Sequence, residues 1–322
     1  MNHETEEATD YVLSRFVSPN PQSIRFERFT LIHPNSVTES RSLVIGATDW
    51  LLQLDYQSFA LLHNRSMIGS GDEPKPYHCQ ALICDEQRNW LIACGTNGHG
   101  QCSIHDLNNI SSILYEPKES VVSDNPNGST VVLIGPGPIL QSNMSNTALY
   151  VASTSNDHYR NEIVATRSLQ VESLMQLVYA DISSGTRLYL NNAIAGHFYL
   201  EYIYAFQSNG FTFFIVVEST QNRKDIITKL VRICQNDNRY YSYTEVPLRC
   251  HSNRTVSKAR RAFHLRSPVE SNLYEHLVVI FDASGSSSHN AVCMYQLSAI
   301  QAQIDANIAK CFDGQGFQNI HY

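Results

Sequence analysis

Hydrophobic residues in this chain gather in short runs, and these runs recur in pairs along most of its length. In each pair an apolar run is followed by a small or polar break and then by a second run rich in β-branched or aromatic residues. Such runs, bounded by Gly, Asn, Ser and Asp, are typical of β-strands. The five pairs occupy residues 43–55, 91–107, 149–166, 213–234 and 277–297.

The spacing of these pairs predicts the fold class. Successive pairs begin 48, 58, 64 and 64 residues apart, and weaker strands such as 130–134 and 240–246 flank them. A repeat that holds one sheet of about four strands in roughly 45–65 residues is typical of a β-propeller blade. The pattern therefore predicts an all-β propeller, of which this chain carries about five blades.

Helical patterns are few. Residues 171–178 predict a short turn or two of helix, whereas 297–310 carries a leucine and three isoleucines at spacings of 3, 4 and 4. We interpret this second stretch as a helical connector packed on the rim of the propeller. No Pro/Gly-rich linker or charge block divides the chain, which favours a single domain.

Composition narrows the function classes. The chain of 322 residues is 43% hydrophobic and 16% charged, and its net charge of −7 argues against nucleic-acid binding. No run approaches the ~18 apolar residues of a membrane span. The polar, acidic N-terminus lacks the order of a secretory signal and, taken alone, indicates a cytosolic chain. The eight cysteines show neither the CxxC nor the CxxH spacing of zinc sites.

Motifs that carry catalysis are absent from the sequence. There is no nucleophile elbow, P-loop or Rossmann glycine pattern, and the prolines of 134–138 remove N–H donors that a phosphate cradle needs. His99 and His105 lie six residues apart, and we interpret them as ordinary surface histidines rather than metal ligands. We predict no catalytic residue, no metal site and no cofactor.

Asn-x-Ser/Thr sequons are candidate glycosylation sites. Chance alone yields about three in a chain this rich in Asn and Ser, so accidental sequons remain the alternative. The sequons lie at Asn64, Asn109, Asn127, Asn143 and Asn253.

The densest motif is ITKLVRICQND at 227–237, followed by YSYTEVPLRC at 241–250. This run resembles the fourth blade of plexin sema domains, whereas semaphorins carry a different, tryptophan-containing segment there. Other segments resemble further parts of the plexin sema domain in the same order: VIGATDWLLQL at 44–54, CGTNGHGQC at 94–102, 128–138 with 149–154, and CFDGQG at 311–316. The resemblance covers 26–322, as a partial sema domain with blades one to five, after a flexible segment at 1–25.

This resemblance implies a ligand-binding, non-enzymatic ectodomain of a plexin-like semaphorin receptor, which acts in cell guidance signalling on the extracellular side of the plasma membrane. The expected partner is the sema domain of a semaphorin, and homo-association is a second partner hypothesis. The alternatives are a semaphorin-class ligand, a sema protein of the hepatocyte-growth-factor-receptor type and a propeller enzyme with its site in the axial channel. The small, apolar residues at the strand entries disfavour the enzyme.

The sequence departs from the family by lacking a signal peptide, a cysteine-bearing insert before the second blade and the segment after the fifth of seven blades. We therefore expect blades one and five to expose the sheet faces that meet the missing blades. Each of these faces is expected to carry several large apolar side chains.

The resemblance also implies a disulfide pattern. It pairs Cys94 with Cys102, and Cys250 with Cys293. Two further cysteines match family half-cystines whose usual partners lie in the segment absent here, so we expect neither to form its family disulfide; they are Cys234 and Cys311. A bond between these two is the alternative.

Cys79 and Cys84 fall in the expected inner strand of the second blade, where the family has no matching cysteines. Their spacing of five residues predicts side chains on opposite faces of the strand. We interpret both as buried, apolar-like cysteines.

Two surface features are candidates for binding. Loops at 156–161 and 221–225 join the paired strands of blades three and four, a part of the rim where the resemblance implies contact with the ligand; plain solvent loops are the alternative. The candidate ligand-binding residues are Asn156, Asp157, Tyr159, Arg160, Gln221, Arg223 and Lys224. The second feature is a basic run, interpreted as a solvated connector with a glycosaminoglycan contact as the alternative; it comprises Arg249, Arg254, Lys258, Arg260, Arg261 and Arg266.

Overall fold

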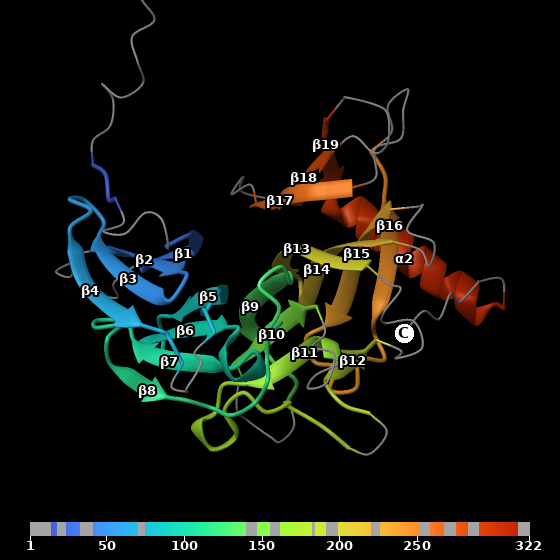
Figure 1. The fold of residues 1–322 in the computed structure, drawn as a ribbon. Coiled ribbons are helices and arrows are strands. Elements are labelled where there is room, and N and C mark those ends of the chain that lie inside the picture. The colour runs from blue at the N-terminus through green and yellow to red at the C-terminus, as the bar shows by residue number, and fades with distance from the viewer. Residues whose placement is uncertain are drawn as a thin grey trace, which may run out of the picture. The chain divides into compact units, whose positions relative to one another are not determined.

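The computed structural model describes residues 14–17, 24–32, 41–69, 75–139, 147–154, 162–181, 184–190, 199–219, 226–250, 258–266, 275–282 and 290–314. These residues form five antiparallel sheets and one α-helix. The chain divides into two compact units, Met1–Lys118 and Glu119–Tyr322 (Figure 1). The prediction of an all-β fold is confirmed.

The first unit holds two sheets, each with its strands in sequence order. Sheet one consists of β1 (Phe26–Ile32), β2 (Ser42–Ala47), β3 (Trp50–Asp55) and β4 (Leu61–Ser66). Sheet two consists of β5 (Cys79–Asp85), β6 (Trp90–Gly95), β7 (Cys102–Asp106) and β8 (Ile113–Tyr115). A core that includes Val44 and Leu51 of sheet one, with Leu82 and Leu91 of sheet two, joins the two sheets.

The second unit holds three sheets and the helix α2 (Leu297–Phe312). Sheet three consists of β9 (Thr130–Pro136), β10 (Thr147–Ser153), β11 (Glu162–Ser168) and β12 (Arg187–Tyr189). Sheet four consists of β13 (Tyr199–Ser208), β14 (Phe211–Ser219), β15 (Ile226–Cys234) and β16 (Thr244–Leu248). Sheet five consists of β17 (Lys258–Arg266), β18 (Glu275–Asp282) and β19 (Ala291–Gln296).

The strand pairs expected from the hydrophobic pattern are the second and third strands of the five sheets. Two flanking predictions need correction. The strand expected at 240–246 begins only at Thr244, because Tyr240 takes a left-handed conformation (φ 58°) and its buried hydroxyl hydrogen-bonds to Thr166. The helical turn expected at 171–178 is confined to a 3-10 turn at Val171–Ser173, and the chain then passes through Met175 at φ 63°.

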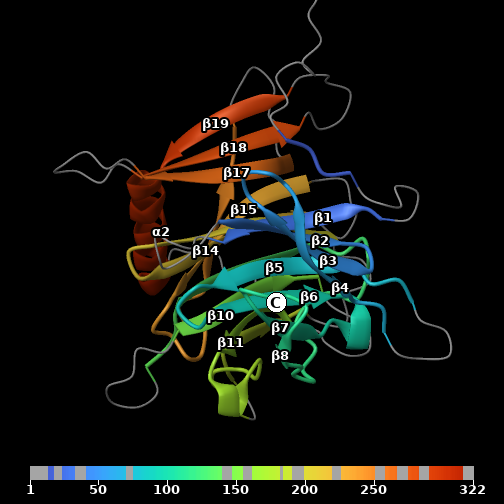
Figure 2. The same cartoon turned by 90° about the vertical axis from the view of Figure 1, so that its left-hand side faces the viewer.

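The helix predicted at 297–310 is present as α2, and it covers a core shared by sheets four and five. Leu297 and Ile304 of α2 are fully buried in this core. Figure 2 shows α2 standing across one end of the strands of sheet five. A hydrogen bond of 3.0 Å from Arg232 of β15 to Asp305 adds a polar contact to this packing.

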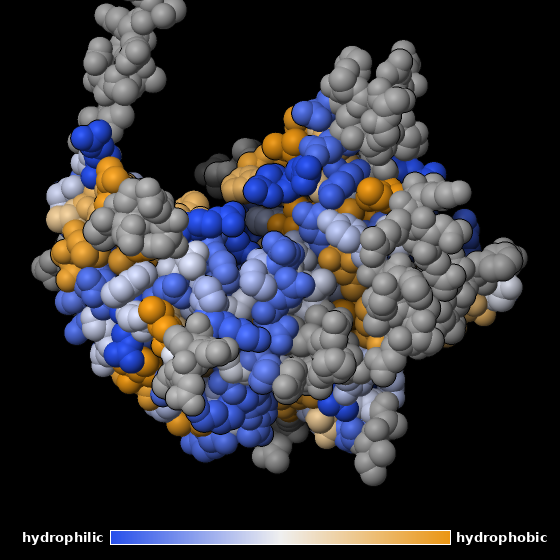
Figure 3. All heavy atoms as spheres, viewed as in Figure 1, coloured by the Kyte–Doolittle hydropathy of each residue, from blue (hydrophilic) through white to orange (hydrophobic). Residues whose placement is uncertain are grey.

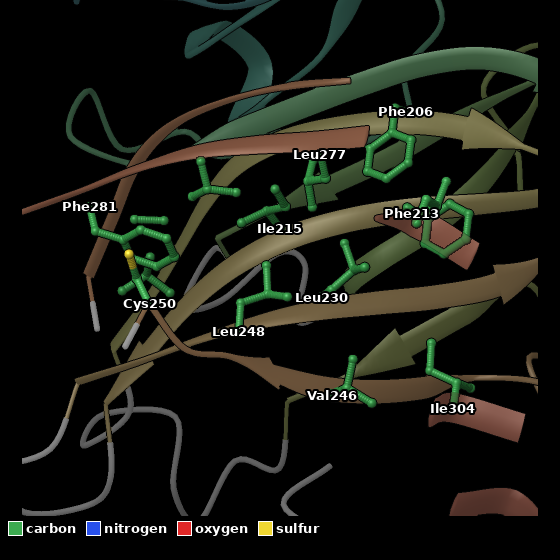
Figure 4. Packing of buried hydrophobic residues seen from close by; sticks show 14 residues of the cluster. Phe206, Phe213, Ile215, Leu230, Val246, Leu248, Cys250, Leu277, Phe281 and Ile304 are labelled. Atoms are coloured by element: carbon green, nitrogen blue, oxygen red, sulfur yellow. The ribbon is translucent and has the colours of Figure 1, made fainter. Parts of the chain in front are cut away.

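Aromatic and β-branched residues fill the core between sheets four and five (Figure 4). Phe206 and Phe213 stack with their ring centroids 4.9 Å apart at one end of it. Leu277 and Phe281 of β18 enter the same core from sheet five, and both are fully buried. Figure 4 places Cys250 beside Phe281, toward the opposite end of the cluster from Phe206.

Both disulfides implied by the resemblance are present. Cys94 and Cys102 lie directly opposite each other on β6 and β7, with their Cα atoms 3.9 Å apart. Cys250, which follows β16, bonds to Cys293 of β19, 43 residues further along the chain. A loop of this length is expected to stabilise the fold by about 4 kcal/mol.

The other two matching cysteines do not bond to each other. Cys234 ends β15, and Cys311 lies exposed in the last turn of α2. The alternative of a bond between them is therefore not adopted in this structure.

Cys79 and Cys84 lie on the same side of β5, contrary to the prediction of opposite faces. Gln80 is an extra residue in the pairing of β5 with β6, and this β-bulge shifts the alternation of side chains by one. As a result the Cys79 sulfur lies against Gly46 of sheet one, and the Cys84 sulfur is 3.6 Å from the Thr30 hydroxyl of the same sheet. Burial raises the pKa of Cys79 to about 12 and that of Cys84 to about 11, which supports their apolar-like role.

The two faces of sheet five differ in burial. Its inner face packs on sheet four, whereas its outer face exposes large apolar side chains among charged ones (Figure 3). Phe263, Ile280, Val292 and Met294 are 59%, 43%, 67% and 66% exposed. In the strand register Arg261, Ile280 and Val292 form one row across the face. This outer face agrees with the exposed blade face expected from the sequence.

Candidate ligand-binding surface

The seven candidate ligand-binding residues of the two loops, Asn156, Asp157, Tyr159, Arg160, Gln221, Arg223 and Lys224, lie outside the described residues. The structure does describe the strand ends that carry both loops. These are Ser153 and Glu162 for the loop of sheet three, and Ser219 and Ile226 for the loop of sheet four.

The strand ends that carry the two loops lie on the same side of adjacent sheets. Ser129, just before β9, donates its N–H to the Thr154 hydroxyl at 2.8 Å, next to the end of β10. The Ser129 hydroxyl in turn accepts the N–H of Tyr202 of β13, also at 2.8 Å. Because Tyr199 at the start of β13 pairs with Ser219, both loops leave from one edge of the second unit. We call this side, where β10, β14 and β18 end, the loop edge.

A largely buried group of three charges supports the loop of sheet four. Lys229 of β15 forms ion pairs with Glu218 of β14 and, at 2.5 Å, with Glu245 of β16. Burial disfavours the charged form of Lys229, but Glu245 and Glu218 outweigh this effect and its pKa is raised. One cation thus links β14, β15 and β16 of sheet four.

A second network lies on the exposed part of the loop edge, where sheets four and five meet. The Tyr199 hydroxyl donates to Glu201 at 2.5 Å, and Glu201 lies 3.2 Å from the Lys258 amine. The same amine lies 5.3 Å from the centre of the Tyr199 ring. Burial raises the pKa of Tyr199, and Glu201 adds to that rise. The tyrosine is therefore held as a neutral, oriented group beside a cation.

Most cations of the basic run are neutralised within the described residues. Lys258 pairs with Glu201, Arg260 pairs with Asp282, and Arg266 lies 3.2 Å from Glu275. Arg254 lies outside the described residues. This pairing weakens the glycosaminoglycan alternative, since a polyanion would have to displace bound carboxylates.

Sheet three presents a similar aromatic and cationic pair at the loop edge. Tyr189 ends β12 opposite Glu162, the first residue after the loop of that sheet. The Arg187 guanidinium lies 4.7 Å from the centre of the Tyr189 ring. Burial raises the pKa of Tyr189, which is still 38% exposed. Tyrosine and arginine are the residue types that most often anchor protein interfaces.

Sequence reasoning missed Tyr189 and Tyr199 as part of this surface. No local motif marks them, because each reaches the loop edge through strand register. Lys258 and Tyr199, for example, are 59 residues apart in the chain. The sequence signal that could have indicated them is an aromatic residue at the loop-side end of a flanking strand. This feature is too common to identify a binding surface.

His99 and His105 occupy different environments, and the interpretation of both as surface histidines is wrong for His105, which is fully buried. Both ring nitrogens of His105 are engaged, one with the Ile110 carbonyl at 2.7 Å and the other with the Ser103 hydroxyl at 2.8 Å. Burial lowers the pKa of His105 to about 4. His99 lies in the 3-10 turn between β6 and β7. In the described parts of the chain, no three His, Cys, Asp or Glu side chains gather as a metal site would require.

Three of the candidate glycosylation sites are described, and all three asparagines are exposed. Asn64 lies on β4, whereas Asn109 and Asn127 lie in turns. Asn143 and Asn253 lie outside the described residues. Glycosylation at these sites remains a prediction.

Among the described helices, none has the length and apolar character needed to cross a membrane. No protein-family model matches the chain. Curated relatives do match it, at low identity. Plexin-2 of Caenorhabditis elegans is 24% identical over 86% of this chain, and mouse plexin-B2 is 25% identical over 92%. The chain spans 15% and 17% of the length of these two relatives.

Solved structures agree on the fold. The extracellular region of plexin A4 superposes with a TM-score of 0.72 at 20% identity, over 84% of this chain and 27% of that one. Semaphorin 2a of Drosophila gives a TM-score of 0.58 at 14% identity, over 88% of this chain and 49% of that one. A complex of Drosophila plexin A with semaphorin 1b gives 0.53 at 12% identity, with 88% and 55% covered.

These comparisons confirm the sema-type fold class and the resemblance drawn from the motifs. The five sheets of the chain match sema domains of plexins and semaphorins alike, and the match to plexin A4 has the highest TM-score of the three. The chain is a distant homologue of the plexins over most of its length, with the all-β fold of the sema region in their extracellular part.

Proposed function

We propose that this chain is the ligand-binding sema region of a semaphorin receptor, acts outside the cell and binds the sema domain of a semaphorin through the loop edge. The observation that carries the proposal is the plexin homology, which extends over 92% of the chain in the comparison with mouse plexin-B2. The loop edge supports it, because the strand ends that carry the two loops and several oriented aromatic and charged side chains lie on one side of the second unit.

The chemistry of this surface suits a protein partner. Tyr189 and Tyr199 are each about one-third exposed and each lies against a cation, so their side-chain entropy is already reduced before binding. The charged groups beside Tyr199 are one carboxylate and one cation, Glu201 and Lys258. Such a surface favours a partner with complementary charges of both signs over a uniformly charged polymer.

The proposal includes no catalysis. Propeller enzymes need ionisable side chains that converge from several blades, and the sequence supplies mostly small and apolar residues at the strand entries. The two disulfides support action outside the cell, since such bonds form and persist in oxidising compartments.

Binding measurements with purified semaphorin sema domains test this function. We expect charge reversal by Arg223→Glu, and separately Arg160→Glu, to weaken binding of a cognate semaphorin by about tenfold or more, as for an anchoring arginine. Lys118→Glu is the matched control, because it reverses an exposed charge outside the second unit. Binding that survives both loop variants, or that the control weakens equally, contradicts the proposed site. Failure of every semaphorin to bind the chain contradicts the proposed function.

A further inference from the structure

A polar cluster closes the junction of sheets four and five at the end opposite to the loop edge. The buried Glu275 carboxylate at the start of β18 accepts a hydrogen bond from the Ser208 hydroxyl at the end of β13. Its other oxygen lies 3.2 Å from the Arg266 guanidinium of β17. Arg266 also donates to the Gln207 carbonyl. One carboxylate therefore connects β17 and β18 of sheet five to β13, the edge strand of sheet four.

His264 lies inside this cluster and faces sheet four. It is opposite Leu277 in the strand register, and its side chain is only 7% exposed. Its ring centroid lies 4.5 Å from that of Phe206. The buried Nε2 atom has no hydrogen-bond partner within 3.5 Å, and it lies 3.6 Å from a Glu275 oxygen, a distance at which a protonated ring forms an ion pair.

The one opposite charge beside His264 is Glu275, and this carboxylate already pairs with Arg266 and accepts a hydrogen bond from Ser208. The elements packed on it present one carboxylate, one guanidinium, hydroxyls and aromatic rings; these groups are Glu275 on β18, Arg266 on β17, Tyr204, Phe206 and Ser208 on β13, and Phe213 on β14. Arg232 of β15 is directed to Asp305 and Phe211. Burial lowers the pKa of His264, Glu275 opposes this effect, and Arg266 adds to it.

The sign of the resulting pH dependence follows from linkage. Because the pKa of His264 is lower in the folded than in the unfolded chain, the unfolded or opened state takes up a proton first as the pH falls. The stability that neutral His264 contributes is complete above its ordinary pKa of about 6.5 and is lost progressively below it.

We propose that the junction between sheets four and five is an acid-sensitive hinge, which opens from the His264 end while the Cys250–Cys293 disulfide holds the other end. The disulfide joins the end of sheet four to β19, and Figure 4 shows Cys250 beside Phe281, far along the core from Phe206. Opening separates β17 from β13 around Phe206 and hydrates the imidazole. Sheet five and α2 move with it as far as the disulfide allows.

Hydrogen–deuterium exchange of the full chain at low micromolar concentration, at about pH 7.5 and pH 5 and corrected for intrinsic rates, tests the hinge. At the acidic pH we expect faster hydrogen exchange at residues 204–208 and 262–266. The largest expected increase in rate is about tenfold for each unit by which folding lowers the pKa of His264. His264→Gln, which keeps a neutral polar side chain, is expected to abolish this pH dependence. His276→Gln is the matched control, because His276 lies on the opposite face of β18.

Equal protection of these segments at both pH values overturns the proposal, as does pH dependence that persists in His264→Gln or disappears in His276→Gln. If His264→Gln fails to fold, NMR titration of the His264 imidazole in the wild-type chain decides the question. A titration midpoint below about 6.5 supports the hinge, and a midpoint at or above this value refutes it.

Discussion

The outer face of sheet five gives the most direct test of the packing argument. Phe263, Leu265, Ile280, Val292 and Met294 are between 41% and 67% exposed. Complete burial of such a side chain stabilises by about 1.5–3 kcal/mol. Burying the half of each side chain that is still exposed would therefore contribute roughly 1 kcal/mol more. Covering all five side chains of this face would therefore contribute about 5 kcal/mol of hydrophobic free energy.

Two such faces in contact gain about 10 kcal/mol, against roughly 4 kcal/mol or more for the loss of translational and rotational freedom. The net free energy of association is at most about 6 kcal/mol, which corresponds to a Kd of tens of micromolar or weaker. We therefore expect the chain alone to be monomeric at low concentration and to self-associate reversibly as its concentration rises toward about 200 µM.

Sedimentation velocity over this concentration range is the appropriate assay. The double variant Val292→Thr, Met294→Lys is expected to remain monomeric throughout and to unfold at the same urea concentration as wild type, because both side chains are already two-thirds exposed. Val279→Thr, on the buried face of the same sheet, is the control and should lower stability by about 1–3 kcal/mol without reducing association. Association that is equally strong in the double variant refutes the reasoning, and so does a wild-type dimer that persists below about 1 µM.

Three further predictions concern stability and redox state. Gly46→Ala places a methyl group against the Cys79 sulfur and is expected to lower the free energy of unfolding in urea by about 1–3 kcal/mol. Adding Cys79→Ala should recover most of this loss, and the absence of recovery would contradict the contact. Lys229→Met leaves Glu218 and Glu245 without their shared cation and should lower the free energy of unfolding by about 2 kcal/mol. Lys229→Arg, which keeps the charge, should lower it by less, and equal losses would show that charge is not the cause. Thiol titration of the denatured, unreduced protein should find four thiols, since two disulfides use four of the eight cysteines; eight reactive thiols would contradict the disulfides.

Local sequence patterns are sufficient to predict the central strands, for a physical reason. A run such as 213–218 is almost entirely β-branched or aromatic, so it suits a strand that is covered on both sides. The same reasoning fails at Gln80, because a β-bulge depends on how two strands pair and not on the composition of either. It also fails at Tyr240, where the burial of one ring and its bond to Thr166 favour a turn over strand propensity.

The candidate site is less predictable from sequence than the fold. Strand boundaries locate the two loops, and they follow from the hydrophobic pattern. The residues next to these loops cannot be predicted in the same way, because Glu218, Lys229 and Glu245 meet only through the register of three strands. The pairing of Lys258 with Glu201 requires, in addition, that sheets four and five be packed together. Long-range packing is the information that a local pattern lacks.

The positions of the loop edge and of His264 have a consequence for function. They lie at opposite ends of the same junction, and the Cys250–Cys293 disulfide is on the loop-edge side. Acid-induced opening at His264 should therefore leave the Tyr199–Lys258 contact largely in place, since the disulfide limits movement there. Without the disulfide, the same opening would separate β13 from β17 along their whole length and disrupt the Tyr199 network. The disulfide thus allows one end of the junction to respond to pH while the proposed binding surface keeps its geometry.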